Sequence, residues 1–275
     1  MIKLICSDID GTLLNAEREL SALTVSEINK LDLPVVLISS RMPSAMRHLQ
    51  NQLSIEDQPI VAYNGGLILA QDKIKQSTTI PFELVSEICR LNADGLHLSL
   101  YNNDNWFAPK DDRWTQRERH NTKVNPVIKS NSNVLNLWRK QGIGAHKIMC
   151  MGESSLVDKF YNLLGNQLSA DVHLFRSKDT YIEIAPKKIS KRSAIEFLAE
   201  QVFDTELPMI MSFGDNYNDI EMLRSCGLGL AVGNAKPEVK QVANQIIGNA
   251  KEGGLAMYYC IRFSAYYLPE FLLIY

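Results

Sequence analysis

Short apolar runs alternate with amphipathic stretches in the first part of the chain. Buried-type runs occupy 2–6, 34–39 and 59–63, and small or polar residues end each of them. Between these runs, 21–31 and 44–53 carry apolar side chains at helical spacing. Strands that alternate with helices predict right-handed crossovers and a parallel sheet. The carboxyl ends of such strands meet at one edge, where open α/β sheets bind their ligands.

The pattern changes in the middle of the chain. A hairpin is expected from the runs at 67–70 and 74–79, and helices are expected at 82–91 and 156–168. Further strands are expected at 96–101, 106–108, 146–151, 172–175 and 181–184. The polar, charged stretch 109–133 predicts a solvated helix face or loop. These segments predict an α+β unit inserted into the first domain.

From Ser190 the α/β pattern returns. Ser190 suits a helix cap, and an apolar face follows it. A strand at 209–213 ends at Gly214-Asp215, and a helix at 218–224 comes next. The remaining expected elements are short strands at 227–232 and 245–247 and a last helix from 254 onward.

Composition narrows the function classes. The 275 residues are 45% apolar and 22% charged, as in ordinary globular proteins of one large or two smaller domains. A net charge of −2 gives no electrostatic reason to expect nucleic acid or a membrane as partner. Five scattered cysteines without a CxxC pair predict reduced thiols and a cytoplasmic setting. We expect neither a secretion signal nor a spanning segment.

The most informative polar residues follow the first strand. Asp8 and Asp10 lie two apart on an extended segment, so their side chains point the same way. Two carboxylates on one side repel each other unless a cation or a proton joins them. The pair therefore indicates a divalent metal, with one carboxylate free for acid/base work. The alternative is an Asp-Gly turn that only closes the strand.

Further polar clusters fall at strand ends or at a helix start. They are Ser39, Lys191 and the group Asp215, Asn218 and Asp219. Each alone has an ordinary explanation as a helix cap, a surface lysine or a turn residue. Together they make chemical sense, because carboxylates bind Mg²⁺ while lysine and serine hold phosphate oxygens. A carboxylate can also accept a phosphoryl group and so divide its transfer into two steps.

These clusters resemble the four motifs of the haloacid dehalogenase superfamily. The matching segments are Asp8-Ile-Asp10-Gly-Thr12, Ser39-Ser-Arg41, Ser190-Lys191-Arg-Ser-Ala194 and Gly214-Asp215-Asn-Tyr-Asn218-Asp219-Ile-Glu-Met222. Asn64-Gly65-Gly66 and Val232-Gly-Asn234-Ala235 resemble further marks of its Cof-type phosphatase subfamily. The resemblance covers nearly the whole chain. Ser39 stands where threonine is frequent, and Ser40 and Arg192 stand where glycine is frequent, which leaves the chemistry intact.

The resemblance implies a role for each matched residue. Asp8, Asp10 and Lys191 would be catalytic, with Asp8 as nucleophile and Asp10 as acid and base. Mg²⁺ would be held by Asp8, the backbone carbonyl of Asp10, and Asp215. Asp219 would orient the metal's waters or Lys191. Phosphate and substrate contacts would come from Ser39, Ser40, Arg41, Asn64, Lys191 and Asn218.

The resemblance also implies a domain organisation. A Rossmann-like α/β catalytic core would comprise 1–80 and 184–275, and an inserted α/β cap at 81–183 would set substrate specificity. The polar loop 176–180 precedes the return to the core, so Arg176 and Lys178 are candidate cap contacts; a solvated hairpin turn is the alternative. We expect the apolar tail, 263–275, to be a packed C-terminal segment or an oligomer contact.

The predicted function is Mg²⁺-dependent hydrolysis of small phosphate monoesters, with sugar phosphates as the expected class and an aspartyl-phosphate as intermediate. The expected partner is a small phosphate ester, and the sequence leaves monomer and dimer open. A sugar phosphomutase of the same superfamily is an alternative, and it would clamp a second phosphate with arginines. A non-catalytic regulatory protein on this fold is a third, although it would be free to lose the motif residues that are all present here.

Overall fold

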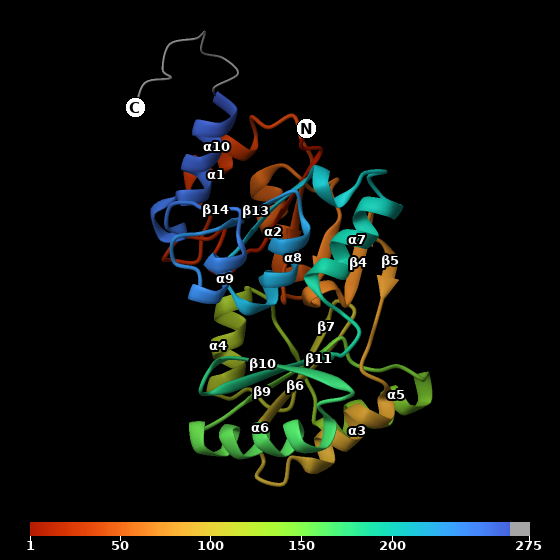
Figure 1. Ribbon diagram of the computed structural model, residues 1–275. Coiled ribbons are helices and arrows are strands. Elements are labelled where there is room, and N and C mark those ends of the chain that lie inside the picture. The colour runs from red at the N-terminus through yellow and green to blue at the C-terminus, as the bar shows by residue number, and fades with distance from the viewer. Residues whose placement is uncertain (265–275) are drawn as a thin grey trace. The chain divides into compact units, whose positions relative to one another are not determined.

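The computed structural model describes residues 1–264, so most of the apolar tail lies outside the described residues. The chain divides into two compact units (Figure 1). Unit 1 comprises Met1–Ser39, Arg47–Val61 and the chain from Ser190 onward; unit 2 comprises Ser40–Met46 and Ala62–Ile189. Each unit is described by itself. The boundaries predicted for core and cap stay a prediction.

A mostly parallel sheet has β1 near its middle; most of its strands belong to unit 1, and β4 and β5 fall within the residue range of unit 2. The strand order of this sheet is β14-β13-β12-β1-β2-β3-β4-β5, and the pairs from β14 to β3 are parallel. The bounds are β1 Leu4–Ser7, β2 Val35–Ile38, β3 Ile60–Ala62, β4 Leu67–Ala70, β5 Lys73–Ser77, β12 Ile210–Gly214, β13 Leu228–Ala231 and β14 Gln245–Ile246. β4 and β5 form the predicted antiparallel hairpin. The predicted α/β fold is confirmed.

Except for α9, which was not predicted, the helices that accompany this sheet begin close to where the pattern placed them. They are α1 Ala22–Ile28, α2 Ser44–Leu53, α7 Lys191–Gln201, α8 Ile220–Ser225, α9 Pro237–Val242 and α10 Gly254–Ser264, with 3₁₀ turns η2 Leu207–Met209, η3 Tyr217–Asp219 and η4 Ala250–Glu252. The helix expected at 218–224 is divided between η3 and α8. No helix within residues 1–264 is both long and apolar enough to cross a membrane.

Unit 2 contains a second sheet, of order β10-β11-β9-β6-β7-β8. Its strands are β6 His97–Asn102, β7 Asn105–Ala108, β8 Val127–Ile128, β9 Lys147–Met151, β10 Val172–Lys178 and β11 Tyr181–Pro186. Its helices are α3 Phe82–Leu91, α4 Arg113–Thr122, α5 Asn131–Gln141 and α6 Ser154–Leu168, and η1 Tyr63–Gly65 is a 3₁₀ turn. The five strands expected in this region are confirmed, with β10 longer than expected, whereas β8 and α5 were not predicted.

The two faces of the second sheet differ in chemistry because side chains alternate along each strand. Leu98, Ile148 and Ile184 lie on the apolar face and belong to one buried core with Val85 of α3 and Leu164 of α6. The opposite face carries Ser99, Tyr101, Lys147 and Glu183, all of them buried. One face of the sheet therefore builds the core of unit 2, and the other buries polar groups.

His146, just before β9, is a buried histidine that the fold keeps neutral. Its Nδ1 accepts the backbone N–H of Asn103 at 3.0 Å, so Nε2 carries the proton and lies 3.0 Å from the hydroxyl of Ser77. Burial lowers the pKa of His146 to about 4. Its unfolded pKa is about 6.5, so the unfolded chain binds more protons between these two values.

We therefore expect His146 to make the fold acid-sensitive. Its contribution is fully present above pH 6.5 and is lost as the pH falls toward 4, with a maximum of about 3 kcal/mol. Urea unfolding at pH 7.5 and 4.5 should show a smaller pH effect in His146→Gln than in the wild type. The exposed His120→Gln is the matched control and should behave like the wild type. Equal pH effects in His146→Gln and the wild type would contradict the assignment.

Candidate active site

Asp8 lies at the end of the central strand of unit 1. β1 pairs with β2 on one side and β12 on the other, and all four of its residues are buried. The backbone N–H of Asp8 donates to the carbonyl oxygen of Phe213 at 3.0 Å. The residue is 6% exposed. Its carboxylate is therefore held at the carboxyl end of β1, the edge where the sequence placed the site.

The turn after Asp8 requires a glycine. Gly11 has a φ of +86°, and a Cβ atom there would lie 2.3 Å from Oδ2 of Asp215. The amide of Asn234 donates to the carbonyl oxygen of Gly11 at 2.7 Å and accepts the N–H of Ala250 at 2.8 Å. Asn234 thus ties the first motif to the η4 turn, a role that its motif resemblance did not assign.

Asp219 organises the second acidic loop. Its Oδ2 accepts the backbone N–H groups of Asp215 and Asn216, both at 2.9 Å. Its Oδ1 accepts from Nζ of Lys191 at 2.6 Å. A Cβ atom on Gly214 would lie 2.5 Å from the Cβ of Asp219, so the loop and strand approach closely. Both oxygens of Asp219 therefore bind groups of the protein itself.

Lys191 is fully buried in the first turn of α7. The hydroxyl of Ser190 caps this helix by accepting the N–H of Ser193 at 3.1 Å. Nζ of Lys191 lies 2.5 Å from Oδ1 of Asp8 and 2.6 Å from Oδ1 of Asp219. A cation in a first turn faces the positive end of the helix dipole. The two carboxylates are what make its burial tolerable.

The cluster carries more negative than positive charge. One carboxylate oxygen each of Asp8, Asp215 and Asp219 lies within 4.8 Å of the others. Burial raises the pKa of Asp8 well above its usual range; Lys191 opposes this, and the two other carboxylates add to it. Burial and then repulsion from Asp219 raise the pKa of Asp215 to about 7. Burial works to lower the pKa of Lys191, but Asp219 and Asp8 raise it overall.

A hard divalent cation fits this donor set. Oδ2 of Asp8 is buried and has no hydrogen-bond partner among the described residues. Within residues 1–264, Oδ1 of Asp215 accepts one long hydrogen bond, of 3.4 Å, from the hydroxyl of Thr12. Because Asp219 already uses both oxygens, Asp8 and Asp215 are the carboxylates of this cluster that can ligate a metal. Mg²⁺ prefers such oxygens and keeps several waters.

Asp10 lies at the edge of the buried cluster. Its Oδ1 accepts from the guanidinium of Arg18 at 2.6 Å, and the two side chains are 37% and 45% exposed. Arg18 has a φ of +64° and was not predicted as a site residue, because no motif marks it. An ion pair this exposed adds little to stability. Its effect is to orient the Asp10 carboxylate.

Ser39 and Asn218 lie at the same edge of the sheet. Ser39 follows β2, is 1% exposed, and donates its backbone N–H to Val61 at 3.0 Å. Asn218 follows β12 in the η3 turn and is half-buried. Because β1, β2 and β12 are parallel neighbours, these residues share the edge that carries Asp8.

Three further residues predicted to contact the substrate belong to unit 2: Ser40, Arg41 and Asn64. Arg41 is buried and donates to the carbonyl oxygen of Ala45 at 3.1 Å. Asn64 has a φ of +56° and donates to Oε1 of Glu183 at 3.1 Å. Their substrate contacts stay predictions.

The polar loop expected at 176–180 is shorter in the structure. β10 continues to Lys178 and pairs with β11 past a register shift, so the connecting turn is only 179–180. The expected loop is therefore wrong in length, because a bulge lets polar residues extend the ladder. Arg176 pairs with Asp158 of α6, which holds its guanidinium against that helix.

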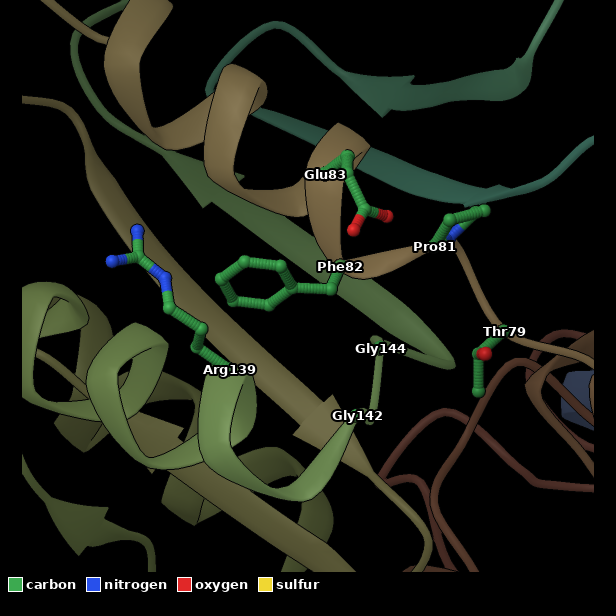
Figure 2. A pocket seen from close by; sticks show the side chains of 7 residues that line it. All are labelled: Thr79, Pro81, Phe82, Glu83, Arg139, Gly142 and Gly144. Atoms are coloured by element: carbon green, nitrogen blue, oxygen red, sulfur yellow. The ribbon is translucent and has the colours of Figure 1, made fainter.

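A hollow of about 470 Å³ lies elsewhere in unit 2 (Figure 2). It is lined by Thr79, Pro81, Phe82, Glu83, Arg139, Gly142 and Gly144. The guanidinium of Arg139 lies over the ring of Phe82, 5.6 Å from its centroid. None of the predicted site residues lines this hollow.

Comparison with known proteins identifies the family. A model of the haloacid dehalogenase-like hydrolases matches residues 5–258. A Haemophilus influenzae protein provisionally named a phosphatase is 33% identical over 264 residues, covering 94% of this chain and 97% of that protein. A Yersinia pseudotuberculosis protein named HMP-PP phosphatase is 26% identical over 265 residues, covering 94% of each chain. The crystal structure of a haloacid dehalogenase-like hydrolase from Bacteroides thetaiotaomicron has a TM-score of 0.86 at 25% identity and covers 96% of this chain and 100% of its own.

The chain belongs to the haloacid dehalogenase-like hydrolases. The assignment of its motifs to this superfamily and its Cof-type phosphatases is confirmed. It is an enzyme of the class that hydrolyses phosphate esters.

Proposed function

We propose that the protein is a Mg²⁺-dependent phosphatase that acts on small phosphate monoesters through an aspartyl-phosphate on Asp8. The state of the Asp8 carboxylate carries this proposal: Lys191 holds Oδ1, while the buried Oδ2 lacks a hydrogen-bond partner among residues 1–264. A carboxylate with a purely structural role would have both oxygens satisfied, because an unpaired buried acceptor costs free energy. The neighbouring Asp215 supplies a second metal ligand.

The residues divide the reaction into two displacements. An oxygen of Asp8 forms a bond to phosphorus as the ester P–O bond breaks, and Asp10 gives its proton to the leaving oxygen. Asp10 then takes a proton from the water that attacks phosphorus, and the bond to Asp8 breaks as inorganic phosphate leaves. Lys191, Ser39 and Asn218 would hold phosphoryl oxygens. Bound Mg²⁺ would supply positive charge beside the phosphoryl group.

Sugar phosphates are the substrate class we propose, and the family resemblance alone supports them. Residues 81–183 are proposed to form the cap that selects among them. The direct test measures inorganic phosphate released from a panel of sugar phosphates and from 4-nitrophenyl phosphate. A phosphomutase would interconvert isomers with little phosphate release, and a regulatory protein would do neither. Either of those results would overturn the phosphatase proposal.

Removal of divalent cations is expected to abolish turnover. A bound Mg²⁺ would join Asp8 and Asp215 and supply positive charge beside the phosphoryl group, so chelation should lower kcat at least about 100-fold, and added Mg²⁺ should restore it. Asp215→Asn should raise the Mg²⁺ concentration for half-maximal activity about tenfold or more. The exposed Asp204→Asn is the matched control. Full activity after exhaustive chelation would exclude the metal-dependent route.

Substrate selection by the end of β10 is a separate prediction. Lys178→Ala should lower kcat/KM for sugar phosphates by about threefold or more, and lower it less for 4-nitrophenyl phosphate, which needs few contacts beyond its phosphoryl group. Arg176→Ala should have the smaller effect of the two, because Asp158 holds its guanidinium. Steady-state kinetics on both substrates test this. Equal losses of kcat/KM on both substrates would show that substrate selectivity depends on residues other than Arg176 and Lys178.

A further inference from the structure

Lys147 is a buried lysine that the catalytic scheme does not use. It begins β9, where it pairs with Tyr101 of β6, and is 3% exposed. Its ammonium lies 4.7 Å from the ring centroid of Tyr101 and 5.7 Å from that of Tyr63. Within residues 1–264 it forms no ion pair with a carboxylate. Lysines are seldom buried unless they are paired, so another group must compensate the charge of Lys147.

Among residues 1–264, the hydrogen-bond acceptor for this ammonium is a backbone carbonyl oxygen. Nζ of Lys147 donates to the carbonyl oxygen of Ser40 at 2.8 Å. A hydrogen bond with a charged donor is stronger than a neutral one, and the two tyrosine faces add cation–π attraction. The orientation of the Ser40 carbonyl is therefore tightly defined.

Ser40 directly follows Ser39, the serine proposed to hold the phosphoryl group. Because the peptide is planar and trans, fixing the Ser40 carbonyl also fixes the direction of the Arg41 N–H, which points the opposite way. The carbonyl oxygen of Arg41 in turn accepts the N–H of Tyr63 at 3.1 Å. Two consecutive peptide groups after Ser39 are thus oriented by residues distant in sequence.

A third contact holds the end of the same segment. Asp104, in the turn between β6 and β7, accepts the N–H of Ser44 at 2.7 Å and the hydroxyl of Ser44 at 2.5 Å. Ser44 is the first residue of α2. The turn that carries Asp104 is itself held, because the hydroxyl of Tyr63 donates to the carbonyl of Asn103 at 2.8 Å. The path from Ser40 to Ser44 is therefore set by unit 2.

We propose that Lys147 is a positioning residue for phosphoryl binding. It fixes the Ser40–Arg41 peptide and thereby the conformation of residues 39–41, which we call the serine turn. The inference rests on the proposed phosphatase function. Lys147 acts on a turn that meets the phosphoryl group, which every substrate shares. Its loss must therefore weaken catalysis equally for all phosphate monoesters. A residue that contacts the leaving group would instead affect large substrates selectively.

The experiment compares Lys147→Met with the wild type on a sugar phosphate and on 4-nitrophenyl phosphate. We expect kcat/KM to fall at least about tenfold, by the same factor on both substrates, and the inhibition constant of inorganic phosphate to rise about tenfold. The melting temperature should change little, because an apolar side chain of similar length replaces a buried ammonium that forms no ion pair with a carboxylate of residues 1–264. Lys140→Met, an exposed lysine in α5, is the matched control and should resemble the wild type.

A double-mutant cycle separates positioning from mere structural support. Lys147→Met should lower kcat/KM by a much smaller factor in the Ser39→Ala background than in the wild type, because Lys147 acts through the serine turn. If Lys147→Met unfolds, Lys147→Gln keeps an uncharged donor, and kcat is then compared per folded molecule. Unequal losses on the two substrates, additive effects with Ser39→Ala, or losses that only track the folded fraction would each overturn the inference.

Failure of the phosphatase proposal would look different. A wild-type protein that releases no phosphate from any monoester would remove the proposed function. Calorimetric titration with inorganic phosphate, in the presence of Mg²⁺, would then still report on Lys147. Weaker phosphate binding by Lys147→Met than by Lys140→Met supports the inference, and equal binding overturns it.

Discussion

Asp8→Asn is expected to abolish turnover in a protein that stays folded. The amide keeps the size of the side chain but cannot attack phosphorus as a carboxylate does, and no second carboxylate takes its place. Asp219 uses both oxygens within the protein, and Asp10 is needed for proton transfer. We expect kcat to fall at least about 10³-fold, a barrier increase of about 4 kcal/mol or more.

The stability of this variant should be unchanged or higher, since one of three crowded carboxylates becomes neutral. Circular dichroism and thermal unfolding check the fold, and phosphate release checks activity. The matched control is Asp57→Asn, the same change at an exposed position of unit 1. Retention of more than about a hundredth of wild-type kcat would argue against the covalent route.

Much of the fold was predictable because its signals are local. The helices at 44–53 and 82–91 have the bounds that the apolar spacing indicated. The capping role of Ser190 also followed from residue type alone. In contrast, α5 was missed because its polar first turn continues the charged stretch before it, and α9 because it has only six residues.

The site was predictable at the level of residues and unpredictable at the level of bonds. The motifs named Asp8, Lys191, Asp215 and Asp219, and the structure brings these side chains together. Asp219 is unable to ligate a metal because backbone N–H groups in the loop after β12 already donate to it. The direction of these N–H groups cannot be read from the spacing of residues in the sequence. Arg18 was missed for a related reason: its contact with Asp10 spans an irregular turn.

Lys191→Met is expected to impair both catalysis and stability. The ammonium is fully buried between Asp8 and Asp219, so its removal leaves three carboxylates within 4.8 Å of one another without a cation. Removing one partner of a buried ion pair costs about 3–5 kcal/mol, because the remaining charge stays buried. We expect kcat to fall about 10³-fold, since the phosphoryl group loses its principal protein cation.

The stability loss should depend on pH with a defined sign. The pKa values of Asp8 and Asp215 are already raised in the folded protein, and without Lys191 they rise further. The folded variant then binds more protons than the unfolded chain, so its stability falls as the pH rises. Thermal unfolding should therefore show a larger loss at pH 8 than at pH 6, and Mg²⁺ should recover more stability in the variant than in the wild type. Arg192→Met, exposed in the same helical turn, is the matched control. A variant as stable as the wild type at pH 8, or with kcat within tenfold of it, would show that Lys191 does not have this role.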